Sequence, residues 1–275
     1  MLIDAHTHLN LQDLFIDRKT HLTDFQNAGG KILVNAGAHS DYNQKGILIA
    51  QEAKTLFPEL IVKATVGFHP EDAHDIANSD FSALMDELAQ QYLTHPNEII
   101  AIGECGIDLH TTEKANLPHQ QELFKLHAEL AHKLQLPLVI HSRDGFEETL
   151  EVLQPFTDLH LYFHCRGYGA AEIHKIEKLF PHVRFGFTNV LSYPNAQKTR
   201  ESLLAAHQQH ILLETDAPFL PPQTLRGQKN VPAYVKEVYQ KASEVLALSS
   251  SDLENLIEKN FATIFSCNSS LESIQ

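Results

Sequence analysis

Two histidines one position apart stand near the start of the chain, in LIDAHTHLN at residues 2–10. Successive side chains of a strand point to opposite faces, so an extended chain here places His6 and His8 on one face. Imidazole is a common ligand of zinc and other transition metals, and two neighbouring imidazoles could form half of a metal site. Taken alone, such a pair is more often structural and held by hydrogen bonds. A metal site therefore requires further ligands from distant parts of the chain.

Residues able to bind a metal or accept a proton also follow several later apolar runs. They are His69, Glu104, His141, His164 and Asp216. Together with His6 and His8, the imidazoles of His141 and His164 and the two carboxylates make six candidate ligands. This number exceeds what one tetrahedral ion with an open position takes, and it predicts two divalent ions. We expect one ion on His6, His8 and Asp216. We expect the other on His141 and His164, with the carboxylate of Glu104 bridging the two.

Two ions about 3.5 to 4 Å apart can polarise a phosphoryl oxygen, activate a water molecule and stabilise the leaving oxygen. Asp216 is placed to take the proton from that water. Structural alternatives exist for both carboxylates: Glu104 paired with a lysine or arginine, and Asp216 as a helix N-cap. Histidine-rich ligand sets favour zinc, with manganese or magnesium as the alternatives.

Eight short apolar runs alternate with helical stretches. The expected strands are residues 2–6, 31–37, 60–67, 98–104, 136–142, 159–165, 183–189 and 210–216. Continuous apolar runs are typical of parallel strands covered on both faces. The clearest helix spans 119–135, where leucines recur three and four positions apart, and terminal helices are expected at 231–246 and 251–265.

This alternation predicts an α/β fold, a (β/α)8 TIM barrel in one domain over residues 1–275, with 266–275 as a frayed tail. An open doubly wound sheet is the alternative. In a barrel the carboxyl ends of the strands form one rim, where active sites are built. The candidate ligands would then converge although they are far apart in sequence.

The composition restricts the choice of partners. Lysine and arginine total 21 against 35 aspartates and glutamates, giving a net charge of −14. This is the wrong sign for broad adhesion to duplex DNA, but a nucleic acid could still enter a metal site by one end. The chain has three cysteines, no signal-peptide pattern and no apolar stretch of membrane length. We therefore expect a cytoplasmic protein with no membrane partner. A monomer is the default expectation for its oligomeric state.

The chain resembles the TatD family of metal-dependent hydrolases, within the amidohydrolase superfamily. The motifs are IDAHTHLN, VGFHP (66–70), IGECGID (102–108), LPLVIHSRD (136–144), FHC (163–165), LLETDAPFLPP (212–222) and RGQKNVP (226–232). The resemblance implies a (β/α)8 barrel with two metals and catalytic roles for Glu104 and Asp216. It also implies that His69 contacts the scissile phosphate. The implied ligands are His6, His8, Glu104, His141, His164 and Asp216. The implied activity is phosphodiester hydrolysis, commonly as a deoxyribonuclease acting on DNA ends or single strands.

The chain departs from the family pattern where substrate should lie. It has Cys165-Arg166-Gly167-Tyr168 where the family usually has Cys-Phe-Ser-Gly, and Lys229-Asn230-Val231-Pro232 where Arg-Asn-Glu-Pro is usual; Leu109 replaces a tyrosine. Arg166 could contact a phosphate and Tyr168 could stack on a base, although a solvated loop is an equal alternative.

Several other polar residues carry weaker expectations. Arg143 could bind a phosphate, but pairing with Glu214 is preferred. Asp4 could orient an imidazole, and Cys105 and Cys165 are expected to pack rather than react. Two further functions remain open. The first is a small-molecule amide, lactone or phosphotriester hydrolase, and the second is a metal-binding barrel without catalysis.

Overall fold

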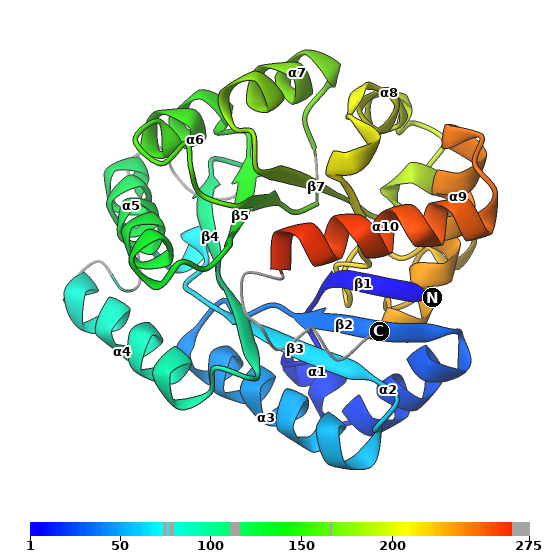
Figure 1. Cartoon of the computed structure of the whole chain (residues 1–275), viewed down its shortest axis with the longest axis horizontal. Coiled ribbons are helices and arrows are strands. Elements are labelled where there is room, and N and C mark those ends of the chain that lie inside the picture. The colour runs from blue at the N-terminus through cyan, green and yellow to red at the C-terminus, as the bar shows by residue number, and fades with distance from the viewer. Residues whose placement is uncertain (74–75, 77–79, 111–115, 166, 266–275) are drawn as a thin grey trace.

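The computed structural model describes residues 1–73, 76, 80–110, 116–165 and 167–265. Eight parallel strands lie side by side in the order of the chain (Figure 1). They are β1 (Leu2–Thr7), β2 (Gly30–Asn35), β3 (Ile61–Val66), β4 (Ile99–Asp108), β5 (Leu138–Arg143), β6 (Leu161–Phe163), β7 (Val183–Phe187) and β8 (Ile211–Leu213). The predicted barrel is confirmed. The open doubly wound alternative is wrong, because such a sheet reverses its strand order partway.

The seam between the first and last strands closes through backbone hydrogen bonds just beyond β8. The N–H of Asp216 donates to the carbonyl of His6 at 2.9 Å, and the N–H of His8 donates to the carbonyl of Ala217 at 2.7 Å. Three candidate ligands from opposite ends of the chain are thus joined by the closure of the barrel itself.

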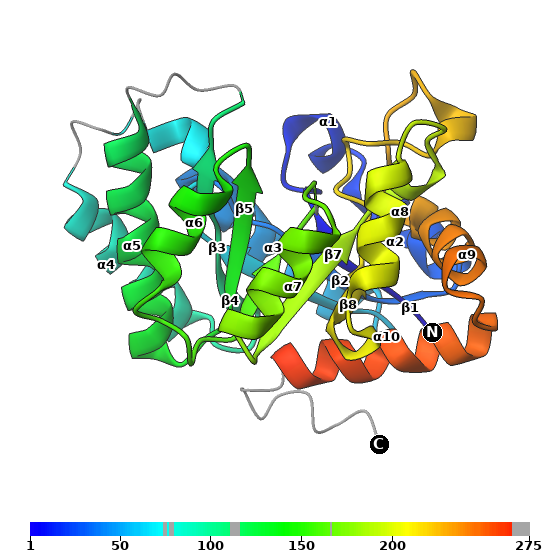
Figure 2. The ribbon, with the colours of Figure 1, turned by 90° about the horizontal axis from the view of Figure 1, so that it is seen from above.

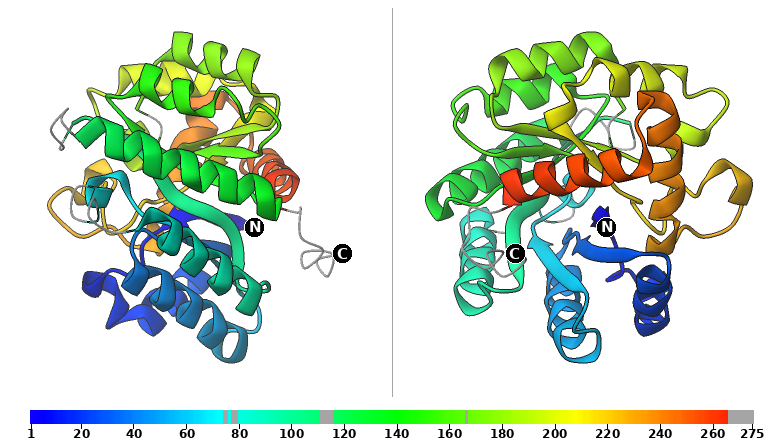
Figure 3. Two further views of the ribbon diagram at one scale, coloured as in Figure 1. Left: turned by 90° about the vertical axis from the view of Figure 1, so that its left-hand side faces the viewer. Right: turned by 45° about the vertical axis from the view of Figure 1, so that its right-hand side comes forward.

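Helices surround the strands on the outside (Figure 3). The α-helices are α1 (Gln12–Phe15), α2 (Arg18–Asn27), α3 (Ser40–Leu56), α4 (Phe81–Thr94), α5 (Leu117–Leu134), α6 (Phe146–Leu153), α7 (Ala170–Leu179), α8 (Gln197–Ala205), α9 (Val235–Leu246) and α10 (Ser250–Phe265). Short 3-10 turns are η1 (Pro70–Ala73), η3 (Asn189–Ser192), η4 (Gln208–His210), η5 (Gln223–Leu225) and η6 (Pro232–Tyr234).

The predicted helices agree with these elements. The helix expected at 119–135 is α5, and the one expected at 251–265 is α10. The helix expected at 231–246 begins as η6 and continues as α9, and the expected tail at 266–275 lies outside the described residues. None of the helices in the described part of the chain is both long and apolar enough to cross a membrane.

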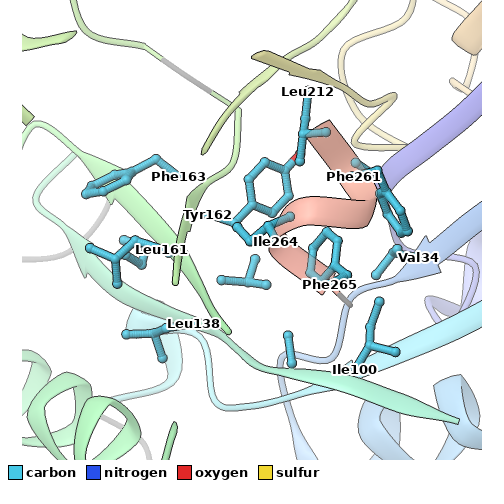
Figure 4. Close-up of a cluster of buried hydrophobic side chains, with 14 of the residues drawn as sticks. Val34, Ile100, Leu138, Leu161, Tyr162, Phe163, Leu212, Phe261, Ile264 and Phe265 are labelled. Atoms are coloured by element: carbon cyan, nitrogen blue, oxygen red, sulfur yellow. The ribbon is translucent and has the colours of Figure 1, made fainter. Parts of the chain in front are cut away.

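One end of the barrel is closed by α10, which lies below the strands in Figure 2 and crosses in front of them in Figure 1. Its side chains Phe261, Ile264 and Phe265 are almost fully buried. They pack with Tyr162, Leu212 and other strand residues in the cluster of Figure 4. Burial of these rings removes apolar surface from water and fills the amino-terminal end of the barrel. Among the described residues, α10 thus covers the amino-terminal end of the strands, and the opposite, carboxyl end is not covered by it.

Strand β4 is longer than the predicted 98–104, because it continues past Glu104 to Asp108. The pairing of β4 with β5 shifts register between Ile102 and Cys105, which is a bulge. Gly103 has a φ of +123° and its missing Cβ would lie 2.4 Å from the carbonyl oxygen of Val139, so only glycine fits there. The bulge thus turns Glu104 toward the interior and lets the strand carry a second carboxylate beyond it.

Candidate active site

A first cluster of ligand atoms lies at the β1–β8 seam. The Nε2 atoms of His6 and His8 are 3.2 Å apart. Oε2 of Glu104 lies 3.4 Å from Nε2 of His6 and 3.6 Å from Nε2 of His8. Oδ1 of Asp216 lies 3.8 Å from Nε2 of His6 and 3.4 Å from Nε2 of His8. Two imidazole nitrogens and two carboxylate oxygens therefore face one common point.

A second cluster adjoins the first across Glu104. Oε1 of Glu104 lies 3.0 Å from Nδ1 of His141 and 2.6 Å from Nε2 of His164. The two imidazole nitrogens are themselves 3.2 Å apart. Glu104 thus directs one oxygen to each cluster, and the rings of His6 and His164 stack with centroids 4.0 Å apart between them. This is the arrangement that a bridging carboxylate requires.

The donor set fits divalent cations of the zinc type. Four ligands placed about 2.0–2.1 Å from a tetrahedral ion lie about 3.3 Å from one another. The described separations in the first cluster run from 3.2 to 3.8 Å. Neutral imidazoles with carboxylates also suit manganese. The six predicted ligands are brought together by the fold, and their role as ligands stays a prediction.

The charges in the clusters are set by burial and by one another. Burial alone would raise the pKa of Glu104, but the imidazoles of His164, His69 and His141 hold that pKa well below its usual range. Burial, with the nearby charge of His164, lowers the pKa of His6 to about 4. At neutral pH Glu104 is therefore ionised and His6 is neutral, which are the forms that ligate a cation.

His69 lies beside the second cluster, but its ring is oriented to donate a hydrogen bond to the site. Its Nδ1 accepts a hydrogen bond from the N–H of Glu71 at 3.2 Å, so the ring proton resides on Nε2. Nε2 lies 3.4 Å from Oε1 of Glu104. His69 thus presents a hydrogen-bond donor to the site, which suits contact with a phosphate oxygen better than ligation of a cation.

Asp108 contacts a candidate ligand, and the sequence analysis did not single it out. Its Oδ2 accepts a hydrogen bond from Nε2 of His141 at 2.8 Å, which leaves Nδ1 of that ring facing Glu104. The backbone of Asp108 is held on both sides by buried Gln120 of α5, at 2.9 and 3.0 Å. A carboxylate behind a ligating histidine fixes the ring and raises its basicity. The signal was the position of Asp108 at the end of the IGECGID run.

We expect Asp108→Ala to weaken metal binding at the second cluster by about 10- to 100-fold, because His141 loses the group that fixes its tautomer and orientation. Competition with a chromophoric chelator measures the affinity. Asp108→Asn is the matched control, since its carbonyl oxygen can still accept the hydrogen bond and should recover most of the affinity. Unchanged affinity in Asp108→Ala would show that Asp108 has no part in holding His141.

Both clusters lie at the base of an open pocket of about 930 Å³. Of the predicted substrate contacts, His69, Arg143 and Tyr168 line this pocket, and Arg166 lies outside the described residues. The Tyr168 hydroxyl is 3.0 Å from Oγ of Ser142, and its ring packs edge-on against Phe146 at 5.0 Å. Tyr168 is therefore part of the pocket wall, held in place by its neighbours.

Two expectations about buried carboxylates are wrong. Glu214 is fully buried and accepts hydrogen bonds from the hydroxyl of Tyr162 and the N–H of Cys165, whereas Arg143 is exposed at the pocket, so the two do not pair. Asp4 accepts hydrogen bonds from the N–H and hydroxyl of Thr215 at 2.8 and 2.6 Å. It therefore anchors the backbone just before Asp216 instead of orienting an imidazole.

The two described cysteines differ. Cys105 packs in the core as predicted, with Sγ 3.6 Å from the carbonyl oxygen of Val139. Cys165 was also expected to pack, but a φ of 43° turns it to the pocket wall. Burial and the charges of Asp216 and Glu214 raise the pKa of the Cys165 thiol well above its usual range. The protonated thiol is no nucleophile at neutral pH.

His127 of α5 anchors the segment that carries His69. It is fully buried, its Nδ1 donates to the carbonyl of Leu123 at 2.7 Å, and its Nε2 accepts from the N–H of Phe68 at 3.1 Å. Burial lowers its pKa to about 4.

This depressed pKa predicts acid sensitivity. Between pH 6.5 and 4 the unfolded chain binds a proton at His127 that the folded chain does not bind. The free energy of unfolding therefore decreases as the pH is lowered through this range, and His127 contributes about 3 kcal/mol to the decrease at most. Above pH 6.5 the contribution is constant. Denaturant unfolding of the wild type and His127→Gln should show a flatter profile for the variant over this range. Parallel profiles would contradict the assignment.

Several known proteins are similar to this chain over most of its length. A family model described as TatD related DNase matches residues 3–266. An uncharacterised metal-dependent hydrolase of Mycoplasma genitalium is 31% identical over 267 residues, covering 95% of this chain and 98% of that protein. The human 3'-5' RNA nuclease TATDN2 is 31% identical over 225 residues, covering 80% of this chain and 29% of that protein.

The fold also has close structural counterparts. The crystal structure of YjjV, a TatD homologue from Escherichia coli, superposes with a TM-score of 0.85 at 22% sequence identity, covering 97% of this chain and 98% of that one.

Proposed function

Because the chain belongs to the TatD family of metal-dependent hydrolases, we propose that it hydrolyses phosphodiester bonds of DNA at ends or in single strands, with two divalent ions. The observation that carries the proposal is the carboxylate of Glu104. One of its oxygens faces His6 and His8, and the other faces His141 and His164. Such a shared carboxylate at the base of an open pocket supports a two-ion hydrolytic site.

In this proposal His6, His8 and Asp216 hold one ion, His141 and His164 hold the other, and Glu104 contacts both. When bound, two such ions polarise the phosphoryl group, lower the pKa of a water molecule and stabilise the leaving oxygen. Zinc fits the histidine-rich donor set, and manganese or magnesium are the alternatives.

The remaining chemistry is assigned to side chains of the chain itself. Burial would raise the pKa of Asp216, but the hydrogen bond from His8 and the nearby imidazoles lower it, so the carboxylate is ionised and can accept the proton of the attacking water. His69 donates Nε2–H to a non-bridging oxygen of the scissile phosphate. Arg143, exposed at the pocket, is a second candidate contact for phosphate.

The charge of the pocket favours a short or terminal stretch of nucleic acid over a long duplex. Among the described residues, its lining carries seven carboxylates and two basic side chains. The carboxylates belong to Glu71, Asp72, Glu104, Asp108, Asp144, Glu172 and Asp216, and the basic side chains to Arg143 and Lys198. Two divalent cations would offset most of this negative charge at the base. The rest repels phosphates beyond the bound one, which agrees with the net charge of −14.

A substrate panel tests the proposal. We expect turnover of single-stranded DNA, slower turnover of blunt duplex DNA, and none of either after chelation. Single-stranded RNA belongs in the panel because the related human protein acts on RNA. Turnover of lactones or amides with no release from any phosphodiester would assign the site to the small-molecule alternative.

A further inference from the structure

An exposed aromatic ring stands beside the first ligand cluster. Phe219 follows Asp216 by three positions, and 53% of its surface is accessible to solvent. Its ring lies edge-on to that of His8, with centroids 6.1 Å apart and an interplanar angle of 73°. Most phenylalanines of the chain are buried, so an exposed ring lining the pocket next to a candidate metal ligand calls for a functional explanation.

The backbone under Phe219 is held firmly. Asn230 is fully buried, and its side-chain amide donates to the carbonyls of Thr215 at 2.8 Å, Phe219 at 2.6 Å and Leu220 at 3.2 Å. Its N–H donates to the carbonyl of Pro218 at 3.1 Å. A ring on such an anchored backbone is a preorganised surface, which loses little conformational freedom when something packs on it.

The pocket wall around Phe219 differs from the opposite wall. The apolar surface that begins at Phe219, after β8, extends across the ends of β1 and β2. It is continued by Leu220, Leu11 and Tyr42. The acidic residues Glu71, Asp72 and Asp144 follow β3 and β5 instead. One arc of the rim is thus apolar and aromatic, and the arc after β3 to β5 carries three carboxylates together with the cation of Arg143.

A basic residue adjoins the apolar arc. Lys198 lines the pocket at the start of α8, which follows β7, and β7 neighbours β8 in the barrel. Glu172 of α7 lines the pocket on the same side as Lys198. A lysine after the strand next to β8, together with the exposed ring, matches the two parts of a nucleotide, since the ammonium attracts a phosphate while the ring stacks on a base. The exposed ring therefore favours a nucleotide chain that passes over Phe219.

We propose that Phe219 is a specificity-determining residue that stacks on a nucleobase next to the scissile phosphate. The inference rests on the proposed function for the identity of the ligand. A base can stack on Phe219 only when it is not enclosed in a duplex, so the ring selects unpaired nucleotides. Base stacking on aromatic rings is tolerant of sequence, and we expect little preference among the four bases.

The test compares substrates with and without bases. One substrate is a thymidine dinucleotide with a single phosphodiester, and the other carries tetrahydrofuran residues in place of both nucleosides. We expect Phe219→Ala to lower kcat/KM for the dinucleotide about 5- to 150-fold and to leave the base-free substrate within about twofold. Phe219→Tyr should resemble the wild type, as should Leu93→Ala, which truncates an exposed side chain on α4. Equal losses on both substrates, or none, would overturn the proposal.

A binding measurement separates this inference from the proposed function. An oligonucleotide with methylphosphonate linkages and a 2-aminopurine base cannot be cleaved at those linkages, and its fluorescence is quenched when the base stacks. We expect quenching by the metal-loaded wild type and none by Phe219→Ala. Quenching without hydrolysis of any phosphodiester would refute the hydrolytic function but keep the stacking role. Absence of quenching by the wild type would refute the stacking role even if hydrolysis is found.

Discussion

Glu104→Ala is expected to lower phosphodiester hydrolysis by at least about 10³-fold and to reduce the bound metal below two ions per chain. Both clusters lose an oxygen at once, because Oε2 faces His6 and His8 while Oε1 faces His141 and His164. Loss of one preorganised electrostatic contact in an active site costs about 10²- to 10³-fold, and the loss of an ion adds to it. Initial rates and metal content after dialysis measure the two effects.

Glu104→Gln refines this prediction. Its amide keeps one oxygen able to ligate a cation, but the NH₂ group is a donor and cannot. We expect about one ion per chain and a rate much nearer to that of Glu104→Ala than to the wild type. The matched control is Asp158→Asn, at an exposed carboxylate outside the pocket whose partner is His132 at 3.1 Å. It should bind two ions and act within about twofold of the wild type. Two ions with wild-type rates in Glu104→Ala would refute the bridge.

Asp216→Asn is expected to separate proton transfer from metal binding. The amide oxygen can remain near His6 and His8, so the first ion should stay bound, but the amide cannot accept a proton at neutral pH. General base catalysis contributes about 10²- to 10⁴-fold, and kcat should fall by this factor. Because the hydrogen bond from His8 and the nearby imidazoles lower the pKa of Asp216, the loss should be the same across the neutral pH range.

Single-turnover rates across pH, with metal content determined in parallel, test this assignment. A variant that keeps both ions and the wild-type rate would show that another group accepts the proton. A variant that loses the first ion would show that the charge of Asp216 is needed chiefly for ligation.

The barrel and the convergence of the candidate ligands were predictable because both depend on regular features. Continuous apolar runs marked the eight strands, and the convergence of their carboxyl ends brought His6, Glu104 and Asp216 together. Strand alternation correctly placed His6 and His8 on one face. The expected helices at 119–135 and 251–265 followed from the same kind of periodicity.

The errors arose where the chain leaves regular geometry. Strand β4 continues past the bulge at Gly103, and Asp108 at its end contacts His141. The two-residue alternation of side chains along a regular strand does not anticipate such a bulge. The left-handed φ of 43° at Cys165 turns that residue toward the pocket.

Long-range partners were the other source of error. We expected Arg143 to pair with Glu214, but the hydroxyl of Tyr162 and the N–H of Cys165 donate hydrogen bonds to that carboxylate instead. The backbone at Phe219 is held by Asn230, whose buried side-chain amide donates hydrogen bonds to three carbonyls. Such partners are chosen by packing across the folded chain, and local sequence patterns carry no information about them.

Metal titration of hydrolysis decides whether the protein is a two-ion phosphodiesterase built on Glu104. Protein stripped with chelator is titrated with manganese or zinc while cleavage of an end-labelled single-stranded oligodeoxynucleotide is followed. We expect no cleavage without metal and a rate that rises to a plateau at two equivalents per chain. Full cleavage by the stripped protein, a plateau at one equivalent, or no cleavage at any metal concentration would refute the two-ion site.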